Sequence, residues 1–157
     1  MLTKTTSLLF SVSQRTDILE HPDLIVLKVR IGNSKIILIN IYNGADNSAL
    51  RALLTIELPP LPTIITGDFN LHHPNWSLPE TNESAYAEQF LDWGERQSLV
   101  LLNEPEEVMF ERGSDQSVLD LTWTNQLALP LIRDWTIHAN LDFASDHLPI
   151  TWSMTGK

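Results

Sequence analysis

Thr66-Gly67-Asp68-Phe69-Asn70 is the most informative stretch of the chain, and it ends a short buried strand predicted over Thr63–Gly67. Glycine lets the chain turn sharply as it leaves a sheet. Asp68 and Asn70, two residues apart, can then point the same way. A carboxylate beside an amide at a strand end can take a proton from water and hold a phosphoryl oxygen. The alternative is a turn in which both side chains bond only to nearby backbone.

Two later segments carry side chains of related chemistry. Ser145-Asp146-His147-Leu148-Pro149 enters the last predicted strand, and its histidine can donate to a phosphate or transfer a proton near neutral pH. The alternation of apolar side chains in Ser117–Trp123 puts Asp120 on the opposite face of its strand. A strand carboxylate needs a partner, because burying it unpaired is costly, and His147 is the natural candidate. Taken singly, an Asp-His pair more often belongs to an ordinary loop, and a strand aspartate such as Asp120 to an exposed sheet face.

The rest of the chain predicts strands with a few helices between them. Strands at Asp23–Ile31 and Lys35–Tyr42 flank a turn and indicate a hairpin. Helical spacing of apolar residues predicts helices in Asp46–Ile56 and Ser84–Gln97, the second with an aromatic stripe that packs in the core. Further strands are expected at Leu99–Leu102, Ser117–Asn125, Leu131–His138 and Leu148–Ser153. This series favours an α+β or α/β sandwich in which helices cover sheet faces.

Composition indicates one globular domain over residues 1–157. The chain has 43% hydrophobic residues and no cysteine, which excludes disulfides and thiolate metal sites. No apolar run reaches transmembrane length or makes a signal-peptide core, so we expect an intracellular protein, cytoplasmic or nuclear, with no membrane partner. Twenty acidic against ten basic residues give a net charge of −10. This charge weakens non-specific attraction to DNA but still permits a local basic rim or a cation-filled site.

Together and in this order, the three polar segments resemble the endonuclease/exonuclease/phosphatase family. The resemblance extends from about Asp23 to Trp152 and is closest to endonucleases of non-LTR retrotransposons. Their patterns are similar to Asp68-Phe69-Asn70-Leu71-His72-His73-Pro74-Asn75-Trp76, to Val118-Leu119-Asp120-Leu121-Thr122-Trp123 and to the tyrosine-bearing strand Asn40-Ile41-Tyr42. The resemblance implies a DNase I-like four-layer sandwich, with two packed sheets flanked by helices.

The resemblance also implies a reaction, the hydrolysis of DNA phosphodiesters with Mg²⁺ or Mn²⁺. The catalytic set that it implies is Tyr42, Asp68, Asn70, Asp120 and His147. Asp68 would be the base that activates water, and Asp120 would orient His147. Three members of the set would hold the scissile phosphate: Asn70, Tyr42 and His147.

Metal binding would fall, by the same resemblance, to Asp146 and Asp68. The neighbouring His72 and His73 would suit zinc if taken alone. The resemblance instead puts both histidines in the loop after the catalytic strand, where His73 packs on Trp76.

The chain also departs from the family pattern. The family's first strands carry an asparagine and a metal-binding glutamate, and neither can be placed, because no asparagine precedes Asp23 and Glu20 precedes the wrong strand. Gly44 replaces the usual proline after the tyrosine, and Met109-Phe110 replaces Thr-Phe. We therefore expect a sandwich without its first strands and weak cation binding. The open sheet edge would favour a homodimer unless Met1–Val12 adds a strand.

Three functions are compatible with these observations. The first is a retrotransposon-type DNA endonuclease domain whose activity is impaired by the missing motifs. The second is a non-catalytic remnant, able to dimerise, that acts as an interaction module. The third is a phosphatase that uses the same site on small phosphoesters or lipids. The Asp68–Trp76 run favours DNA, by analogy at the level of the family.

Overall fold

A computed structural model of the chain describes residues 10–77, 82–104, 119–138 and 147–155. It contains a six-stranded sheet of order β1-β2-β3-β4-β6-β5 and a two-stranded sheet, β7-β8. The strands of the larger sheet are β1 (Phe10–Gln14), β2 (Leu24–Ile31), β3 (Ser34–Tyr42), β4 (Thr63–Asp68), β5 (Leu99–Leu101) and β6 (Asp120–Asn125). The other elements are α1 (Ser48–Leu53), α2 (Ala87–Arg96), the 3₁₀ helix η1 (Leu129–Leu131), β7 (Ile132–Ile137) and β8 (Ile150–Met154). The α+β sandwich expected from the sequence is confirmed.

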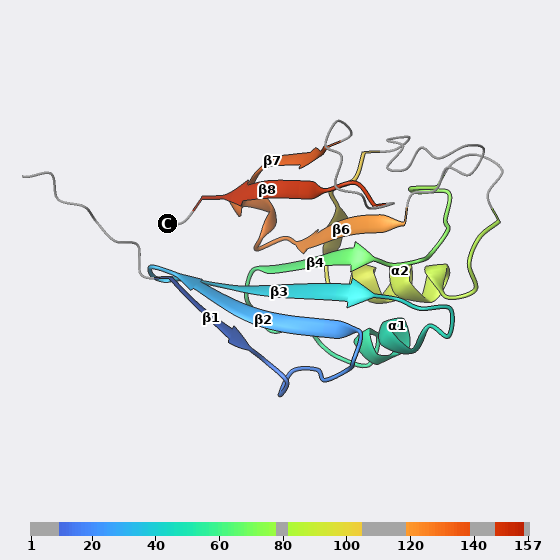
Figure 1. Ribbon diagram of the computed structural model, residues 1–157, viewed down its shortest axis with the longest axis horizontal. Coiled ribbons are helices and arrows are strands. Elements are labelled where there is room, and N and C mark those ends of the chain that lie inside the picture. The colour runs from blue at the N-terminus through green and yellow to red at the C-terminus, as the bar shows by residue number, and fades with distance from the viewer. Residues whose placement is uncertain (1–9, 78–81, 105–118, 139–146, 156–157) are drawn as a thin grey trace, which may run out of the picture.

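The described elements form three layers. Figure 1 shows α1 and α2 together on one side of the larger sheet, near the ends toward which β3 and β4 point. On that face the isoleucines Ile37, Ile39 and Ile41 are at most 1% exposed and join a core with residues of both helices. The opposite face carries Ile36 and Ile64, which pack with side chains of β7 and β8. Alternation along β3 therefore buries two layers of apolar side chains, as a strand period of two requires.

The parallel pairing of β3 and β4 brings polar residues to one end of the sheet. Because α1 lies in the connection between the two strands, both run in the same direction. Their register joins Ile37 to Thr63 at one end and Tyr42 to Asp68 at the other. On its other side β4 pairs antiparallel with β6, where Asp68 faces Asp120. The candidate residues predicted on three separate strands are thus neighbours at one rim.

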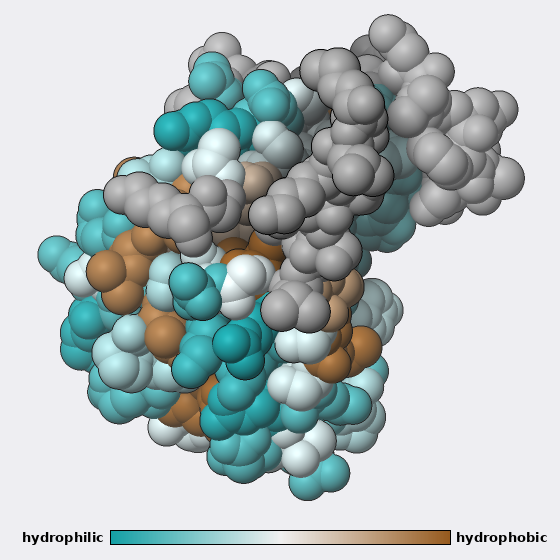
Figure 2. All heavy atoms as spheres, turned by 90° about the vertical axis from the view of Figure 1, so that its left-hand side faces the viewer, coloured by the Kyte–Doolittle hydropathy of each residue, from teal (hydrophilic) through white to brown (hydrophobic). Residues whose placement is uncertain are grey.

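The edge beyond β2 is covered by the chain itself. β1 pairs antiparallel with β2 from Phe10 opposite Ile31 to Gln14 opposite Leu27. The alternative that an N-terminal segment adds its own strand is therefore confirmed for the described part of that segment, and a homodimer through this edge has no support. In the coloured part of Figure 2, apolar residues lie in separate patches among hydrophilic ones, which is ordinary for a protein surface.

Both helices are shorter than the sequence predicts. α1 begins only after Asn47, whose left-handed φ of 54° interrupts the helical backbone. α2 begins at Ala87, and its aromatic residues Phe90 and Trp93 are 0% and 2% exposed, so their assignment to the core is confirmed. Among the described residues, no helix combines the length and apolarity needed to cross a bilayer.

Candidate active site

The site begins where β4 leaves the sheet. Gly67 has a φ of +137°, which side-chain-bearing residues rarely adopt. A Cβ at this position would also collide with the carbonyl oxygen of Ile41 on β3. Glycine is therefore required here for the close approach of β3 as well as for the turn. The result is that Asp68 leaves the sheet against the end of β3.

Asp68 and Asp120 face each other across the β4–β6 pair. The pairing continues beyond the two strands, because the Phe69 N–H donates to the Leu119 carbonyl at 2.9 Å. Like charges directly opposite in a sheet repel each other. Burial raises the pKa of the Asp68 carboxyl, and the nearby Asp120 raises it further, while the Asn70 N–H and His147 act in the opposite direction. A cation between these carboxylates would relieve the repulsion.

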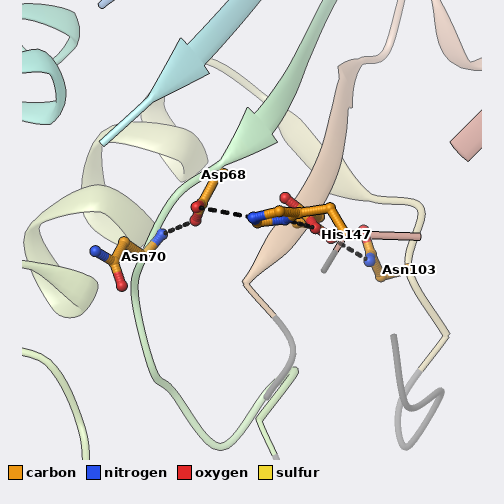
Figure 3. A network of polar contacts seen from close by, with 5 residues as sticks. Asp68, Asn70, Asn103 and His147 are labelled. Carbon is orange, nitrogen blue, oxygen red and sulfur yellow. Dashed lines mark hydrogen bonds and ion pairs between the residues drawn. The ribbon is translucent and has the colours of Figure 1, made fainter. Parts of the chain in front are cut away.

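His147 joins the two carboxylates. Its Nδ1 lies 2.7 Å from Asp120 Oδ2, and its Nε2 lies 4.0 Å from Asp68 Oδ2. The expected Asp120–His147 hydrogen bond is thus confirmed. A carboxylate can only accept, so Nδ1 carries the hydrogen. The imidazole side chain is 54% exposed, whereas the two aspartate side chains are 16% and 18% exposed. Figure 3 shows the ring beside Asp68, with the contact between them drawn as a dashed line.

Asn70 adjoins the site through its main chain. Its N–H donates to Asp68 Oδ1 at 2.9 Å, and its φ of 48° is in the left-handed region that asparagine tolerates. In Figure 3 the Asn70 side-chain amide lies on the side of the chain away from His147. The local turn weighed for this segment is therefore present, and it holds the Asp68 carboxylate in place. The same turn leaves the Asn70 amide exposed.

Of the two remaining residues predicted for the site, the structure describes Tyr42 but not Asp146. Tyr42 is the last residue of β3 and stands in register with Asp68, so both side chains share one face of the sheet. The residue as a whole is 58% exposed. Asp146 lies outside the described residues, as do Met109 and Phe110.

Two buried asparagines next to the site were missed by the sequence reasoning. The Asn43 main-chain N–H donates to the Asp68 carbonyl at 2.8 Å, and its Nδ2 donates to the Phe69 carbonyl at 2.9 Å. Asn103 Nδ2 donates to the Asp120 carbonyl at 3.0 Å. Neither asparagine belongs to a local motif. Their importance follows from which strands pair, which periodicity does not reveal.

A second cluster of potential metal ligands lies in the loop after β4. It consists of His73, Glu83 and Glu88. His73 Nδ1 accepts a hydrogen bond from the Asn75 N–H at 3.1 Å, so in the neutral ring Nε2 carries the hydrogen and meets Glu88 Oε1 at 3.0 Å. A metal would need a lone pair at that nitrogen. The His73 ring also lies 5.1 Å from the Trp76 ring, so the expected packing is confirmed. This cluster anchors the loop to α2.

The first cluster is better suited to a cation. One ligand atom each from Asp68, Asp120 and His147 lie within 4.8 Å of one another. Carboxylate oxygens and one imidazole, with no thiolate, suit hard divalent ions such as Mg²⁺ and Mn²⁺. Burial and the nearby Asp120 raise the pKa of Asp68, and a positive charge at this point would act in the opposite direction. These residues could therefore hold a divalent ion.

Comparison with known proteins gives the same fold. A family model described as endonuclease-reverse transcriptase matches residues 36–151. Similar structures include the endonuclease domain of TRAS1, a telomere-specific non-LTR retrotransposon, with TM-score 0.74 and 24% identity over 92% of this chain and 68% of that chain. A 3'-5' exonuclease, NExo from Neisseria meningitidis, has TM-score 0.62 and 17% identity over 94% and 72%. A 3' phosphatase structure of NExo from Neisseria, bound to a product DNA hairpin, has TM-score 0.60 and 16% identity over 96% and 71%.

These likenesses bear on the fold rather than on the reaction. The identities lie below 25%, so they establish a DNase I-like sandwich and no more. Three further structures of this fold are matched over only 56–61% of their own length. No match was found among curated protein sequences.

Proposed function

The chain belongs to the endonuclease–reverse transcriptase family, and from this premise we propose that it is a retrotransposon-type DNA endonuclease domain that hydrolyses phosphodiester bonds with a divalent cation. The observation that carries the proposal is the facing pair Asp68 and Asp120 with His147 between them. Two half-buried carboxylates in direct opposition repel each other, and a divalent cation used in hydrolysis would remove that repulsion.

Each residue of the site has a role in this proposal. Asp68, whose pKa is raised, is poised to take a proton from the attacking water. Asp120 accepts the hydrogen bond from Nδ1 and stabilises the protonated imidazole, the form in which Nε2 of His147 can donate to a phosphate oxygen. Tyr42 and the Asn70 amide are exposed beside them and would hold other phosphate oxygens.

The cation would be held by Asp68 and Asp120, with Asp146 as a further ligand from outside the described residues. When bound, it would neutralise charge that develops on the phosphate. Two carboxylates make a small ligand set for a hard ion. We therefore propose that the 157 residues by themselves bind Mg²⁺ or Mn²⁺ weakly and cleave slowly.

DNA is the proposed substrate. The family description and the NExo structure with a product DNA hairpin support it, and the similar TRAS1 structure is the endonuclease domain of a retrotransposon. The chain's net charge of −10 argues that affinity comes from the site and its cation rather than from a wide basic surface. A DNA substrate is consistent with an intracellular location, cytoplasmic or nuclear.

The test is nicking of supercoiled plasmid in Mg²⁺ and in Mn²⁺, with EDTA as a blank. Asp68→Ala and His147→Ala should abolish the nicking. Asp92→Asn, on the exposed face of α2, and His138→Gln, whose ring contacts Thr151, are matched controls that should retain it.

Two results would overturn the proposal. Nicking that survives in both site variants would show a contaminating nuclease or another site. Release of phosphate from a small phosphoester without any nicking would instead favour the phosphatase alternative.

A further inference from the structure

Among the strands that the structure describes, β6 has a neighbour on one side only at the end where the site begins. β5 ends at Leu101, which pairs with Trp123 of β6, and only the Leu102 N–H continues the pairing, donating to the Thr122 carbonyl at 2.8 Å. Asp120, the first residue of β6, therefore pairs with β4 on one flank and with no strand of the described residues on the other. A strand end without a partner can shift or fray, and a shift of one residue would turn Asp120 to the other face.

The Asn103 side chain bonds the main chain of β6 at this flank in the way that a neighbouring strand would. Its Nδ2 donates to the Asp120 carbonyl at 3.0 Å, and its Oδ1 accepts from the Thr122 N–H at 2.8 Å. One amide thus bonds the residues on both sides of Leu121, as one residue of a parallel strand does in a sheet. Asn103 is 6% exposed, so these bonds form away from water and hold one geometry.

We propose that Asn103 is a positioning residue that keeps Asp120 opposite Asp68 and thereby sets the orientation of His147. The chain of contacts runs from Asn103 Nδ2 to the Asp120 main chain, and from Asp120 Oδ2 to His147 Nδ1 at 2.7 Å. In Figure 3 Asn103 lies on the side of His147 away from Asp68. The catalytic consequence rests on the proposed nuclease function, whereas the effect on His147 does not.

The chain offers a matched control in Asn125 at the other end of β6. Asn125 is 8% exposed, its Oδ1 accepts from the Thr63 and Ala128 N–H groups at 3.0 Å each, and its Nδ2 donates to the Leu61 carbonyl at 2.8 Å. It is therefore a similarly buried asparagine, at the other end of β6, whose side-chain amide also bridges main-chain groups. Its loss should weaken folding as the loss of Asn103 does, but far from the two carboxylates.

Three variants separate positioning from general stability. Asn103→Ala removes both hydrogen bonds, and Asn125→Ala removes the control bridge. Asn103→Asp keeps an acceptor for the Thr122 N–H but cannot donate to the Asp120 carbonyl when ionised. This second variant keeps the test open if Asn103→Ala does not fold.

The first measurement is the His147 ring tautomer, read from long-range ¹H–¹⁵N NMR correlations and assigned with His147→Gln. We expect the wild type and Asn125→Ala to hold the hydrogen on Nδ1. Asn103→Ala and Asn103→Asp should give averaged nitrogen shifts of a ring that has lost its fixed partner. Unchanged His147 shifts in both Asn103 variants would overturn the inference.

The second measurement is steady-state nicking. The Asn103 variants should lower kcat by about 10–100-fold with KM little changed, the size of effect typical when a partner behind a ligand is lost. Asn125→Ala should retain kcat under conditions where it stays folded. A wild type that does not nick would refute the proposed function, yet the NMR result would still decide whether Asn103 positions Asp120.

Discussion

Asp68 has a pKa above the ordinary aspartate range because it is half-buried and faces Asp120. In the unfolded chain this carboxyl titrates normally, so its ionisation costs folding free energy at pH above the folded pKa. The cost is absent below the unfolded pKa, where Asp68 is protonated in both states. At neutral pH the ionised Asp68 carboxylate therefore lowers the free energy of unfolding.

Replacing that carboxylate should accordingly stabilise the fold. Asp68→Asn keeps an oxygen that accepts the Asn70 N–H and removes the charge. In EDTA at neutral pH we expect the melting temperature to rise by about 2–4 °C, which corresponds to ~1 kcal/mol in a chain of this size. The gain should shrink as the pH falls toward 4. Thermal unfolding across pH, with the exposed Asp92→Asn as control, checks it, and a lower melting temperature at neutral pH would refute the linkage.

Asp120 should control the tautomer of His147. In Asp120→Asn the neutral amide no longer stabilises a positively charged imidazole. Its NH₂ can also donate to Nδ1, which moves the single ring hydrogen to Nε2, the nitrogen that faces Asp68. We expect nicking to fall by about 10²–10⁴-fold, as when a wrong tautomer is fixed in other histidine sites. Kinetics and ring ¹⁵N shifts measured on the same samples test this, and full activity with an unchanged tautomer would contradict it.

Asn70 has two separable functions, one in its backbone and one in its side chain. Glycine tolerates the φ of 48°, so Asn70→Gly should keep the N–H contact to Asp68 and lose only the amide. If that amide holds phosphate, nicking should fall by roughly 10–100-fold with little change in stability, in the range set by a lost hydrogen bond to a charged group. Ser98→Gly, at a φ of 57° on an exposed turn, is the control. Unaltered nicking in Asn70→Gly would leave Asn70 with a backbone function alone.

At the scale of elements, the contact between β3 and β4 depends on one glycine. In Gly67→Ala the new methyl would meet the Ile41 carbonyl, and the φ of +137° is closed to alanine. We expect a loss of roughly 2–4 kcal/mol in the free energy of unfolding, because β4 must move away from β3. Gly32→Ala, in the β2–β3 turn at a φ of +58° with open space around it, should cost only about 1 kcal/mol. Urea denaturation of both variants measures the difference, and equal losses would show that the close approach is unimportant.

At the scale of the whole molecule, charge should limit how the chain meets DNA. Three of its basic residues, Lys28, Arg30 and Lys35, lie on the β2–β3 hairpin, at the end of β3 opposite the site. Without a divalent cation, binding to duplex DNA should be weak, with a slope of log K against log salt of about −1 to −3, since each neutralised phosphate adds about −0.9. Fluorescence anisotropy in EDTA over a salt series measures the slope. A value steeper than about −6 would reveal a basic surface that the charge distribution does not suggest.

Local patterns in the sequence are sufficient for most elements of the fold. Alternating isoleucines predict β3, the aromatic stripe predicts the buried face of α2, and a glycine before Asp68 marks the end of β4. The errors are at element ends, where a left-handed residue such as Asn47 stops a helix for reasons that periodicity does not contain. The homodimer was expected because the sheet edge at β2 was predicted to be open. A strand as short as β1 carries too little sequence pattern to show that it pairs with β2.

For the site, residue chemistry and chain order determined the family, the α+β class and the set Asp68, Asp120 and His147. These features can be predicted from the types of residue and the short spacings between them, both of which are read directly from the sequence. Only the tertiary structure decided the β4–β6 register that opposes the two carboxylates, and the role of Asn103, whose hydrogen bonds span seventeen and nineteen residues. Register and long-range bonds depend on which strands pair and at what offset. No local window of the sequence encodes that choice, because it is set by the packing of the whole sheet.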